Sequence, residues 1–273
     1  MKSRLIYWLT YAGMWLLALL PFKVLYILSD GLCFLMHHVV HYRRRVVRAN
    51  LCNAFPEKSA AELRDIEREF YRYICDYMLE EVKMLRMSFK ELCRRMEYDN
   101  KEEYLAMIEK HGGIVLLIPH YANFEWITGM SSIMQEGDIP VQIYKPLHNK
   151  YMDAMFKRIR TRFGGYNVAK HSTAREIIKL CRDNKRVAVG MITDQSPNPN
   201  EAHYWTTFLN QDTVFMDGAE RIAKLMDFPV FYCELQKQGR DMPVRFDLIT
   251  ERPKQRQTGD NGMFCPSPGT DNP

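Results

Sequence analysis

His120 and Glu125, which are separated by four residues, are the side chains of this sequence best placed for acid–base chemistry. An imidazole can accept a proton from a hydroxyl near neutral pH, and a neighbouring carboxylate can hold the ring in one tautomer. The pair therefore predicts a general base, His120, oriented by an acid, Glu125. The same spacing also occurs in ordinary loops where an acid caps a histidine. The secondary structure predicted around the pair therefore determines how strongly it indicates a catalytic site.

The residues that lead to His120 predict a buried strand. A glycine pair opens an uninterrupted apolar run at 114–118, and Pro119, which cannot donate to a sheet ladder, closes it. An apolar run without polar alternation is typical of a strand buried on both faces. From Asn123 the pattern favours a helix, with Asn123 as its N-cap and Glu125 in its first turn. His120 thus follows the carboxyl end of a strand, where open α/β sheets place their chemistry.

The stretch 112–126, Gly-Gly-Ile-Val-Leu-Leu-Ile-Pro-His-x4-Glu-Trp, resembles the first motif of the bacterial lipid A biosynthesis acyltransferases, a lauroyl/myristoyl group of the lysophospholipid acyltransferase superfamily. The likeness runs from the N-terminus to about Thr250. It implies an acyl carrier protein thioester as the donor. It implies a phosphorylated glycolipid, the lipid A precursor, as the acceptor through a hydroxyl, with no cofactor and no metal. No serine or cysteine stands beside His120, which favours direct transfer without an acyl-enzyme.

Basic residues at family-like positions are predicted to bind the acidic substrate. Lys145 and Asn149 lie in a segment that follows a short strand and resembles the family's second motif. That motif more often carries arginine where this chain has Lys145. A lysine binds phosphate as a single point charge, whereas an arginine can donate two parallel hydrogen bonds. Arg160 and Arg162 precede a small Phe-Gly-Gly loop and would bind phosphate on the acceptor or on the donor's phosphopantetheine arm. A solvated basic helix is the alternative for this arginine group.

Asp194 and Gln195 follow a second apolar run, 187–192, which again predicts a buried strand. The family has a matching Asp-Gln or Asp-His motif in a loop, so the resemblance implies that these two residues shape the site. A turn that begins at the end of the strand is the plainer interpretation.

The first 45 residues predict attachment to a membrane. A basic start precedes an uncharged run at 5–20, a second apolar stretch follows at 24–40, and arginines stand at 43–45 and 48. The arginines suit an anionic cytoplasmic surface, and the absence of a small-residue cleavage site predicts that the segment is retained. One tilted anchor and a helical pair lying partly in the membrane both fit, with a buried soluble hairpin as the alternative. Together with the resemblance, this predicts a bacterial inner (plasma) membrane protein whose catalytic domain faces the cytoplasm.

Composition narrows the class of protein. The chain has 273 residues, of which 47% are hydrophobic and 26% are charged, as expected for a folded protein with a substantial core. A net charge of +5 suits membrane lipid or an acidic substrate, and no nucleic-acid-binding signature accompanies it, so no nucleic-acid partner is expected. The seven cysteines are scattered without a CxxC pair, which predicts reduced thiols and no structural metal.

The remaining pattern alternates helices and strands. Ser59 and Glu62 form a capping box at the start of one amphipathic helix, and 89–110 reads as a second amphipathic stretch. Strands are expected at 141–144, 187–192, 229–235 and 244–249, and helices at 150–163, 174–183 and 219–226. This alternation predicts an α/β fold with a mixed, largely parallel sheet flanked by helices on both faces, preceded by an N-terminal membrane-associated helical segment.

Three regions follow from these patterns. Residues 1–45 are predicted to be an N-terminal membrane anchor, 46–250 an acyltransferase α/β domain, and 251–273 a disordered or divergent tail rich in proline and glycine. Family members usually continue with further helical sequence where this tail stands. Two alternatives to lipid A acylation remain open. One is an acyltransferase for a glycerophospholipid or an aminolipid, and the other is an inactive membrane-tethered relative.

Overall fold

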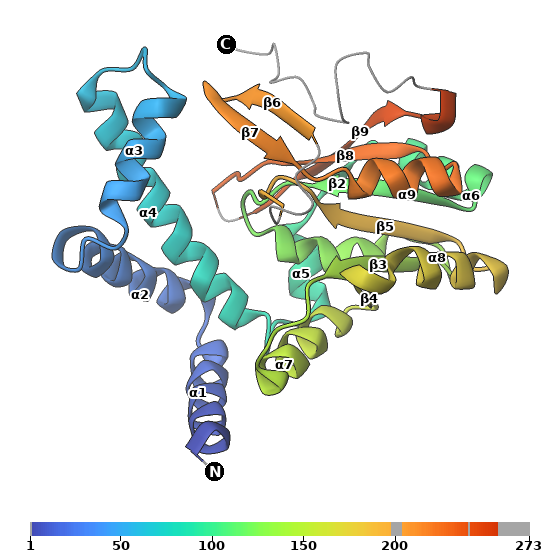
Figure 1. The fold of residues 1–273 in the computed structure, drawn as a ribbon. Coiled ribbons are helices and arrows are strands. Elements are labelled where there is room, and N and C mark those ends of the chain that lie inside the picture. Colours follow the sequence, from blue (N-terminus) through green and yellow to red (C-terminus); the bar gives the residue numbers. More distant parts are fainter. Residues whose placement is uncertain (1, 198–203, 240, 256–273) are drawn as a thin grey trace. The chain divides into compact units, whose positions relative to one another are not determined.

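The computed structural model describes residues 2–197, 204–239 and 241–255 (Figure 1). By its internal contacts the chain divides into two units. The first comprises Met1–Ser88 and Trp205–Thr213, and the second comprises Phe89–Tyr204 and Val214–Pro273. The predicted boundary at residues 45 and 46 falls inside the first unit, because helices on both sides of it pack against one long helix.

The first unit is helical. Its helices are α1 (Lys2–Leu19), α2 (Phe22–Phe34), which continues as the π-helical turn η1 (Leu35–Val39), α3 (Arg44–Ala54) and α4 (Ala60–Lys83). The hairpin of β6 (Tyr204–Phe208) and β7 (Gln211–Phe215) belongs mainly to this unit. The predicted capping box opens α4: the Ser59 N–H donates to Glu62 at 2.8 Å, and the Glu62 N–H donates to the Ser59 hydroxyl at 3.3 Å.

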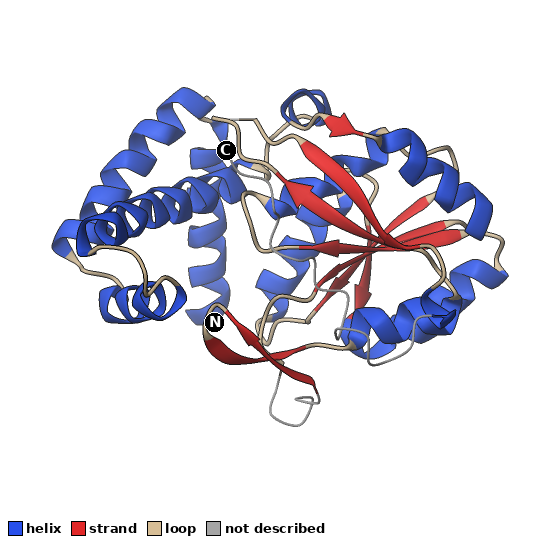
Figure 2. Ribbon diagram, turned by 90° about the horizontal axis from the view of Figure 1, so that it is seen from above, coloured by secondary structure: helices blue, strands red, loops and turns tan. Residues whose placement is uncertain are grey.

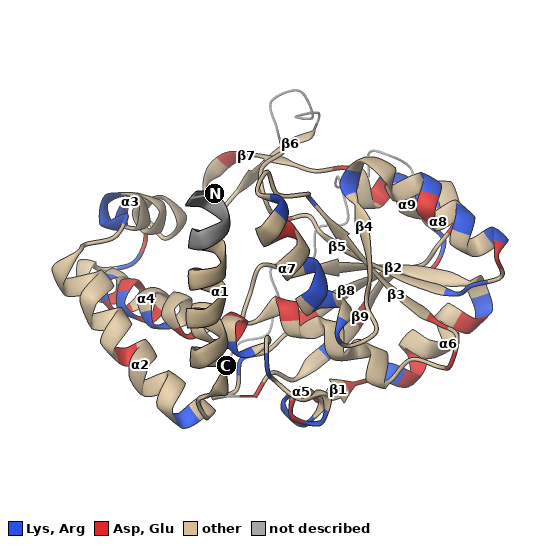
Figure 3. Cartoon of the chain, turned by 90° about the horizontal axis from the view of Figure 1, so that it is seen from below, with Lys and Arg blue, Asp and Glu red and all other residues tan. Residues whose placement is uncertain are grey.

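Side-chain hydrogen bonds hold α2 to α4. Tyr26 donates to the Glu80 carboxylate at 2.8 Å, and Ser29 donates to the Asp76 carboxylate at 2.7 Å. Other positions of α2 are apolar and exposed, such as Ile27 with 69% of its surface accessible. Figure 3 shows how few charged residues α1 and α2 carry compared with α4. Among the described residues one helical segment, Phe22–Val39, is long and apolar enough to cross a membrane.

The second unit is built on a seven-stranded sheet in the order β1-β9-β8-β2-β5-β3-β4. Its strands are β1 (Tyr98–Asp99), β2 (Gly113–Ile118), β3 (Ile139–Tyr144), β4 (Tyr166–Ala169), β5 (Val187–Ile192), β8 (Val230–Leu235) and β9 (Val244–Thr250). Its helices are α5 (Phe89–Arg95), α6 (Lys101–His111), α7 (Lys150–Thr161), α8 (Thr173–Arg182) and α9 (Gly218–Met226), with 3₁₀ turns η2 (Phe124–Ser132), η3 (Lys170–Ser172) and η5 (Pro253–Gln255).

The pairing confirms the predicted fold class. Every neighbouring pair of strands is parallel except β8 and β9, which are antiparallel, and helices flank both faces of the sheet (Figure 2). Strand β2 lies at the centre of the sheet with all six of its residues buried, as the apolar run predicted. Its side chains pack with those of β5 and β8 in one core cluster. A rigid central strand therefore delivers the residues that follow it.

The amphipathic stretch at 89–110 is not one helix. It is interrupted by β1, which pairs in parallel with β9, and Asn100 begins α6 from a left-handed conformation with φ of 46°. The Asn100 side chain bonds both backbone groups of Phe246, donating to its oxygen at 2.5 Å and accepting from its N–H at 3.0 Å. The amphipathic pattern gave no sign of the break because the residues that impose it lie far away along the sequence.

The proposed disordered tail begins at residue 251. Residues 251–255 are described, and they include η5, where Pro253 is buried. Residues 256–273 lie outside the described part of the chain.

Substitution of Gly113 by alanine is expected to destabilise the sheet by about 1–3 kcal/mol, the usual cost of overpacking a core. A Cβ at this position would lie 2.6 Å from the Phe228 ring and 2.8 Å from the backbone oxygen of Val187. Urea unfolding, followed by the transition midpoint, measures this loss. Trimming the ring in a Gly113→Ala/Phe228→Leu double variant should give a loss smaller than the sum of the two single losses. Strict additivity would contradict the steric explanation.

Candidate active site

The carboxyl ends of β2 and β5 bring His120 and Asp194 together. These strands pair in parallel with Ile118 opposite Ile192, so the residues two positions beyond each strand also lie opposite each other. The Asp194 carboxylate lies 2.5 Å from Nδ1 of His120, and its other oxygen accepts the His120 backbone N–H at 2.7 Å. One carboxylate thus fixes both the ring and the main chain of the histidine.

These contacts determine which nitrogen of His120 carries the proton. An ionised carboxylate can only accept, so Nδ1 carries the hydrogen that it shares with Asp194. Nε2 then holds a lone pair, and the amide nitrogen of Gln195 lies 3.0 Å from it, in position to donate. Partial burial alone would raise the pKa of Asp194, but the hydrogen bonds from His120 bring it below its usual value. The ionised Asp194 therefore holds the hydrogen on Nδ1, and Nε2 of His120 faces the pocket with the lone pair that a base needs.

Glu125 makes a different contact from the one the sequence predicted. It stands in η2, with 9% of its surface accessible, and Arg160 of α7 donates to both of its oxygens, one at 2.8 Å from Nε. The tautomer-holding position at Nδ1 of His120 is occupied by Asp194 instead. Sequence spacing could not reveal this exchange of partners because His120 and Asp194 are 74 residues apart.

The segment around Glu125 also differs from the expected α-helix. It is a 3₁₀-helix, and Asn123 makes no side-chain capping bond. The Asn123 backbone, at φ −91° and ψ 74°, lies outside the extended region that an N-cap usually adopts, and its side chain is buried. The tighter helix places Glu125 and Phe124 on the wall of a pocket, with the Phe124 ring edge-on to His120 at 4.8 Å between centroids.

A pocket of about 820 Å³ opens at this edge of the sheet. His120, Glu125, Arg160 and Gln195 line it together with Lys145 and apolar residues that include Phe156 and Met191. Pockets of this size accommodate ligands of several hundred daltons, and the mixed lining suits a molecule with an apolar chain and an anionic group. Of the residues described, no group of three or more His, Cys, Asp and Glu side chains could hold a metal ion.

Two residues predicted to bind substrate have other contacts. Asn149 caps α7, its side-chain oxygen accepting from the N–H groups of Tyr151 at 3.0 Å and Met152 at 3.3 Å. The Arg162 guanidinium lies over the Phe163 ring at 5.2 Å from its centroid. Neither is among the described residues that line the pocket. Three cations that the sequence did not single out do line it, namely Lys157, Lys170 and Arg221.

Comparison with known proteins identifies the family. A family model described as bacterial lipid A biosynthesis acyltransferase matches residues 1–250. The chain belongs to this family. It is 22% identical over 260 residues to the lipid A biosynthesis acyltransferase of Haemophilus influenzae, covering 91% of this chain and 79% of that protein. It is 26% identical over 150 residues to the lipid A biosynthesis lauroyltransferase of Escherichia coli K12, covering 54% of this chain and 48% of that protein.

Family membership gives the site its reaction class. The protein is an acyltransferase of lipid A biosynthesis, as the resemblance of its first motif implied. Acyl transfer to a hydroxyl needs a base beside the nucleophile and a pocket for an apolar chain. At the carboxyl edge of this sheet, His120 and apolar side chains line one pocket, an arrangement that could serve both needs.

Loss of the Arg160 side chain should destabilise this acyltransferase. Arg160→Ala leaves the buried Glu125 carboxylate without its guanidinium, and we expect a loss of about 2–4 kcal/mol, because the loss for a fully buried pair is about 3–5 kcal/mol and Arg160 is partly exposed. Chemical denaturation measures the change. The control is Arg158→Ala, which removes an exposed arginine from the same helix and should change stability by about 0.5 kcal/mol or less. Equal losses in both variants would contradict a specific role for the Arg160–Glu125 pair.

Proposed function

We propose that this acyltransferase moves a fatty acyl chain from an acyl carrier protein thioester to a hydroxyl on a phosphorylated glucosamine disaccharide precursor of lipid A. The contact that carries the proposal is the one between Asp194 and Nδ1 of His120, because it leaves Nε2 with a lone pair at the pocket. The substrates follow from the family resemblance, and the apolar and cationic lining of the pocket supports them.

The reaction runs in two proton transfers. His120 takes the proton of the acceptor hydroxyl on Nε2 while the hydroxyl oxygen attacks the thioester carbonyl carbon. The tetrahedral intermediate then collapses, the carbon–sulfur bond breaks, and the leaving thiolate takes the proton from the imidazolium. Asp194 stabilises that imidazolium through Nδ1 without taking its proton. Gln195 has to yield its contact with Nε2 when the hydroxyl arrives, and its amide oxygen can then turn toward another donor.

The cations of the pocket differ in how far they are already paired. Arg160 is held by Glu125, Lys157 by Asp153 at 2.9 Å, and Arg221 by Asp217 at 3.9 Å. Lys145 is exposed, and its ammonium has no ion-pair partner among the described residues. We therefore assign the main contact with an acceptor or donor phosphate to Lys145, as the second motif implied. Asn149 and Arg162 would act on substrate indirectly, through the ends of α7.

The acceptor lipid requires the enzyme to work at a membrane. The apolar segment Phe22–Val39 and the exposed apolar residues of α1 support attachment there. The proposed location is the bacterial inner membrane, with the sheet and its pocket on the cytoplasmic side, where acyl carrier protein is available. An anchor in residues 1–45 remains part of this proposal.

Purified protein in a neutral detergent provides the direct test. It is given acyl carrier protein thioesters of several chain lengths together with a tetra-acylated lipid A precursor, and products are identified by mass spectrometry. We expect one further acyl chain on the precursor and release of free acyl carrier protein. Parallel reactions contain a lysophospholipid or an aminolipid as the acceptor. Transfer to either of these without transfer to the lipid A precursor would overturn the proposed acceptor.

A further inference from the structure

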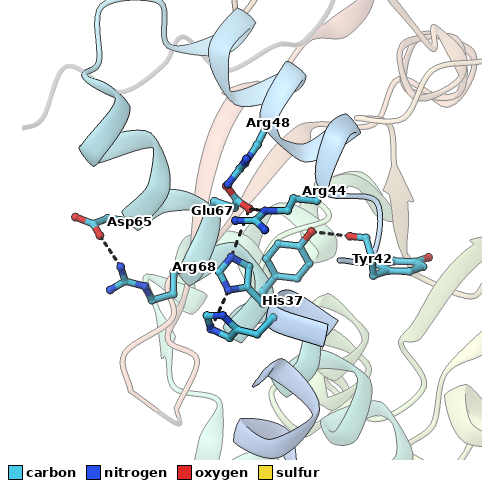
Figure 4. Close-up of polar contacts among 9 residues, drawn as sticks. His37, Tyr42, Arg44, Arg48, Asp65, Glu67 and Arg68 are labelled. Atoms are coloured by element: carbon cyan, nitrogen blue, oxygen red, sulfur yellow. Dashed lines mark hydrogen bonds and ion pairs between the residues drawn. The ribbon is translucent and has the colours of Figure 1, made fainter. Parts of the chain in front are cut away.

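Glu67 is a charged residue buried within the helical unit, far in sequence from the catalytic pair. It lies in α4 with 2% of its surface accessible. Its carboxylate accepts from Nε of Arg44 at 3.0 Å and from Nε of Arg48 at 2.8 Å, and Nε2 of His37 lies 3.4 Å away (Figure 4). Burial alone would raise the pKa of Glu67, but the hydrogen bonds and charges of Arg48 and Arg44 lower it. The carboxylate is therefore ionised at neutral pH.

The two arginines are held by only one nitrogen each. Arg44 and Arg48 are four residues apart on α3 and so share one face of that helix. In the described chain, neither terminal guanidinium nitrogen of either side chain has a hydrogen-bonding partner, and the side chains are 31% and 47% accessible. One buried carboxylate thus aligns two guanidinium groups that are at least partly exposed, and it neutralises only one of their two charges. A fixed pair of donor forks with one excess positive charge suits a phosphate.

The surroundings indicate where that phosphate would come from. Exposed apolar side chains precede the two arginines in sequence and also lie between them, with 63% of Phe34, 59% of Val39, 59% of Val40 and 45% of Val46 accessible. Helix α3 has no buried residue, and the site directly follows the apolar segment Phe22–Val39. Exposed apolar side chains next to arginines are typical of a protein surface that inserts into the headgroup region of a bilayer.

The corner that carries the site is structurally defined. Tyr71 donates to the backbone oxygen of Tyr42 at 2.5 Å, which ties the turn before α3 to α4 (Figure 4). His41 and Arg43 adopt left-handed conformations with φ of 53° and 50°, which non-glycine residues adopt only at a cost. A turn held in this way keeps the two guanidinium groups in place before any ligand arrives.

We propose that Arg44 and Arg48, aligned by the buried carboxylate of Glu67, form a binding site for the phosphate of an anionic membrane phospholipid. The site shares no residue with the acyl-transfer pocket and does not depend on the proposed reaction. It gives the helical unit a specific contact with lipid headgroups in addition to the attraction between a basic segment and an anionic surface.

Charge-preserving variants test this site. The full chain in neutral detergent is titrated with a short-chain fluorescent phosphatidylglycerol, and the Kd is compared with that for the phosphatidylcholine analogue. Arg44→Lys/Arg48→Lys keeps every charge but loses the forks, and we expect the Kd for phosphatidylglycerol to rise about tenfold. The matched control Arg43→Lys/Arg45→Lys alters two exposed neighbours and should change the Kd less than about twofold. Equal weakening in both double variants, or none in either, would overturn the site.

Two further measurements keep the result interpretable. Circular dichroism and thermal unfolding establish that each variant is folded, and if the double variant is not, Arg48→Lys alone, at the more exposed position, should still raise the Kd severalfold. Inorganic phosphate is then added as a competitor against sodium chloride of equal ionic strength. We expect the two salts to release the lipid equally. Selective release by millimolar inorganic phosphate would overturn the lipid assignment in favour of a site for the free anion.

Discussion

Replacement of His120 by alanine is expected to lower acyl transfer by about 10³- to 10⁴-fold, because a hydroxyl without a positioned base is a poor nucleophile. The imidazole is held at Nδ1 by Asp194, and no other described side chain is placed to take over at Nε2. The measurement is the initial rate of thioester consumption and of acylated product at saturating concentrations of both substrates. Thermal unfolding of the variant should show only a small loss, because the His120 side chain is partly exposed and its backbone N–H keeps the bond to Asp194.

A second histidine of the same pocket provides the matched control. His171 lines the pocket, but in the described chain its side chain has no hydrogen bond or ion pair. We expect His171→Ala to retain activity within about threefold. Wild-type activity in His120→Ala, or an equal loss in both variants, would contradict the assignment of His120 as the base.

Local pattern predicted the strand before His120 because every determinant of that strand is local. The strand starts at a glycine, all six of its residues are buried, and a proline ends it. These residues are consecutive in the sequence, and the bounds of β2 agree closely with the predicted run. Strand β5, which ends two residues before Asp194, is likewise a short local run of mostly apolar residues, and its first four residues are buried. Two buried strands with a polar residue at the same distance beyond each end could have indicated the His120–Asp194 contact. That inference would have required the knowledge that β2 and β5 are adjacent parallel strands, which the sequence of neither strand reveals alone.

The features that the sequence did not predict depend on distant partners. Strand β1 has two residues and exists through its pairing with β9, and β4 has four residues beside β3. The pairing of Glu125 with Arg160 needs α7 packed beside η2, and it converts a predicted phosphate ligand into the partner of a buried acid. Periodicity and capping describe one segment at a time, so they cannot assign a partner to a charge.

Asp194→Asn is expected to reduce turnover by about 10³- to 10⁴-fold, nearly as much as removal of the base. Asparagine has almost the same shape as aspartate, but its amide nitrogen can donate to Nδ1, which favours the tautomer with the proton on Nε2 and blocks that atom as a base. The KM values for both substrates should change little, since the pocket keeps its shape. This split between turnover and KM distinguishes a positioning residue from a structural one.

The pH dependence of the unfolding free energy of Asp194→Asn is a second, independent test of the contact between Asp194 and His120. The pKa of Asp194 is lowered in the folded protein, so its contact with His120 contributes stability above the ordinary carboxyl pKa of about 4 and loses it as pH falls through the folded value. Asp194→Asn should remove this contribution at neutral pH and flatten the fall in stability that the parent shows as the pH drops below about 5. A variant whose acid unfolding follows that of the parent would show that the contact is weak.

Glu125→Gln decides between the two acids as partners of the base. If Asp194 orients His120, the glutamine variant should lose stability through Arg160 while keeping a much larger fraction of turnover than Asp194→Asn. If Glu125→Gln instead abolishes turnover at unchanged stability and Asp194→Asn does not, Glu125 must reach the imidazole after substrate binds. Arg160 would then have to release Glu125 during the reaction, and the contact between Asp194 and Nδ1 would describe only the state before substrate enters. The turnover and the stability of the two variants, measured together, therefore show which of the two carboxylates orients His120.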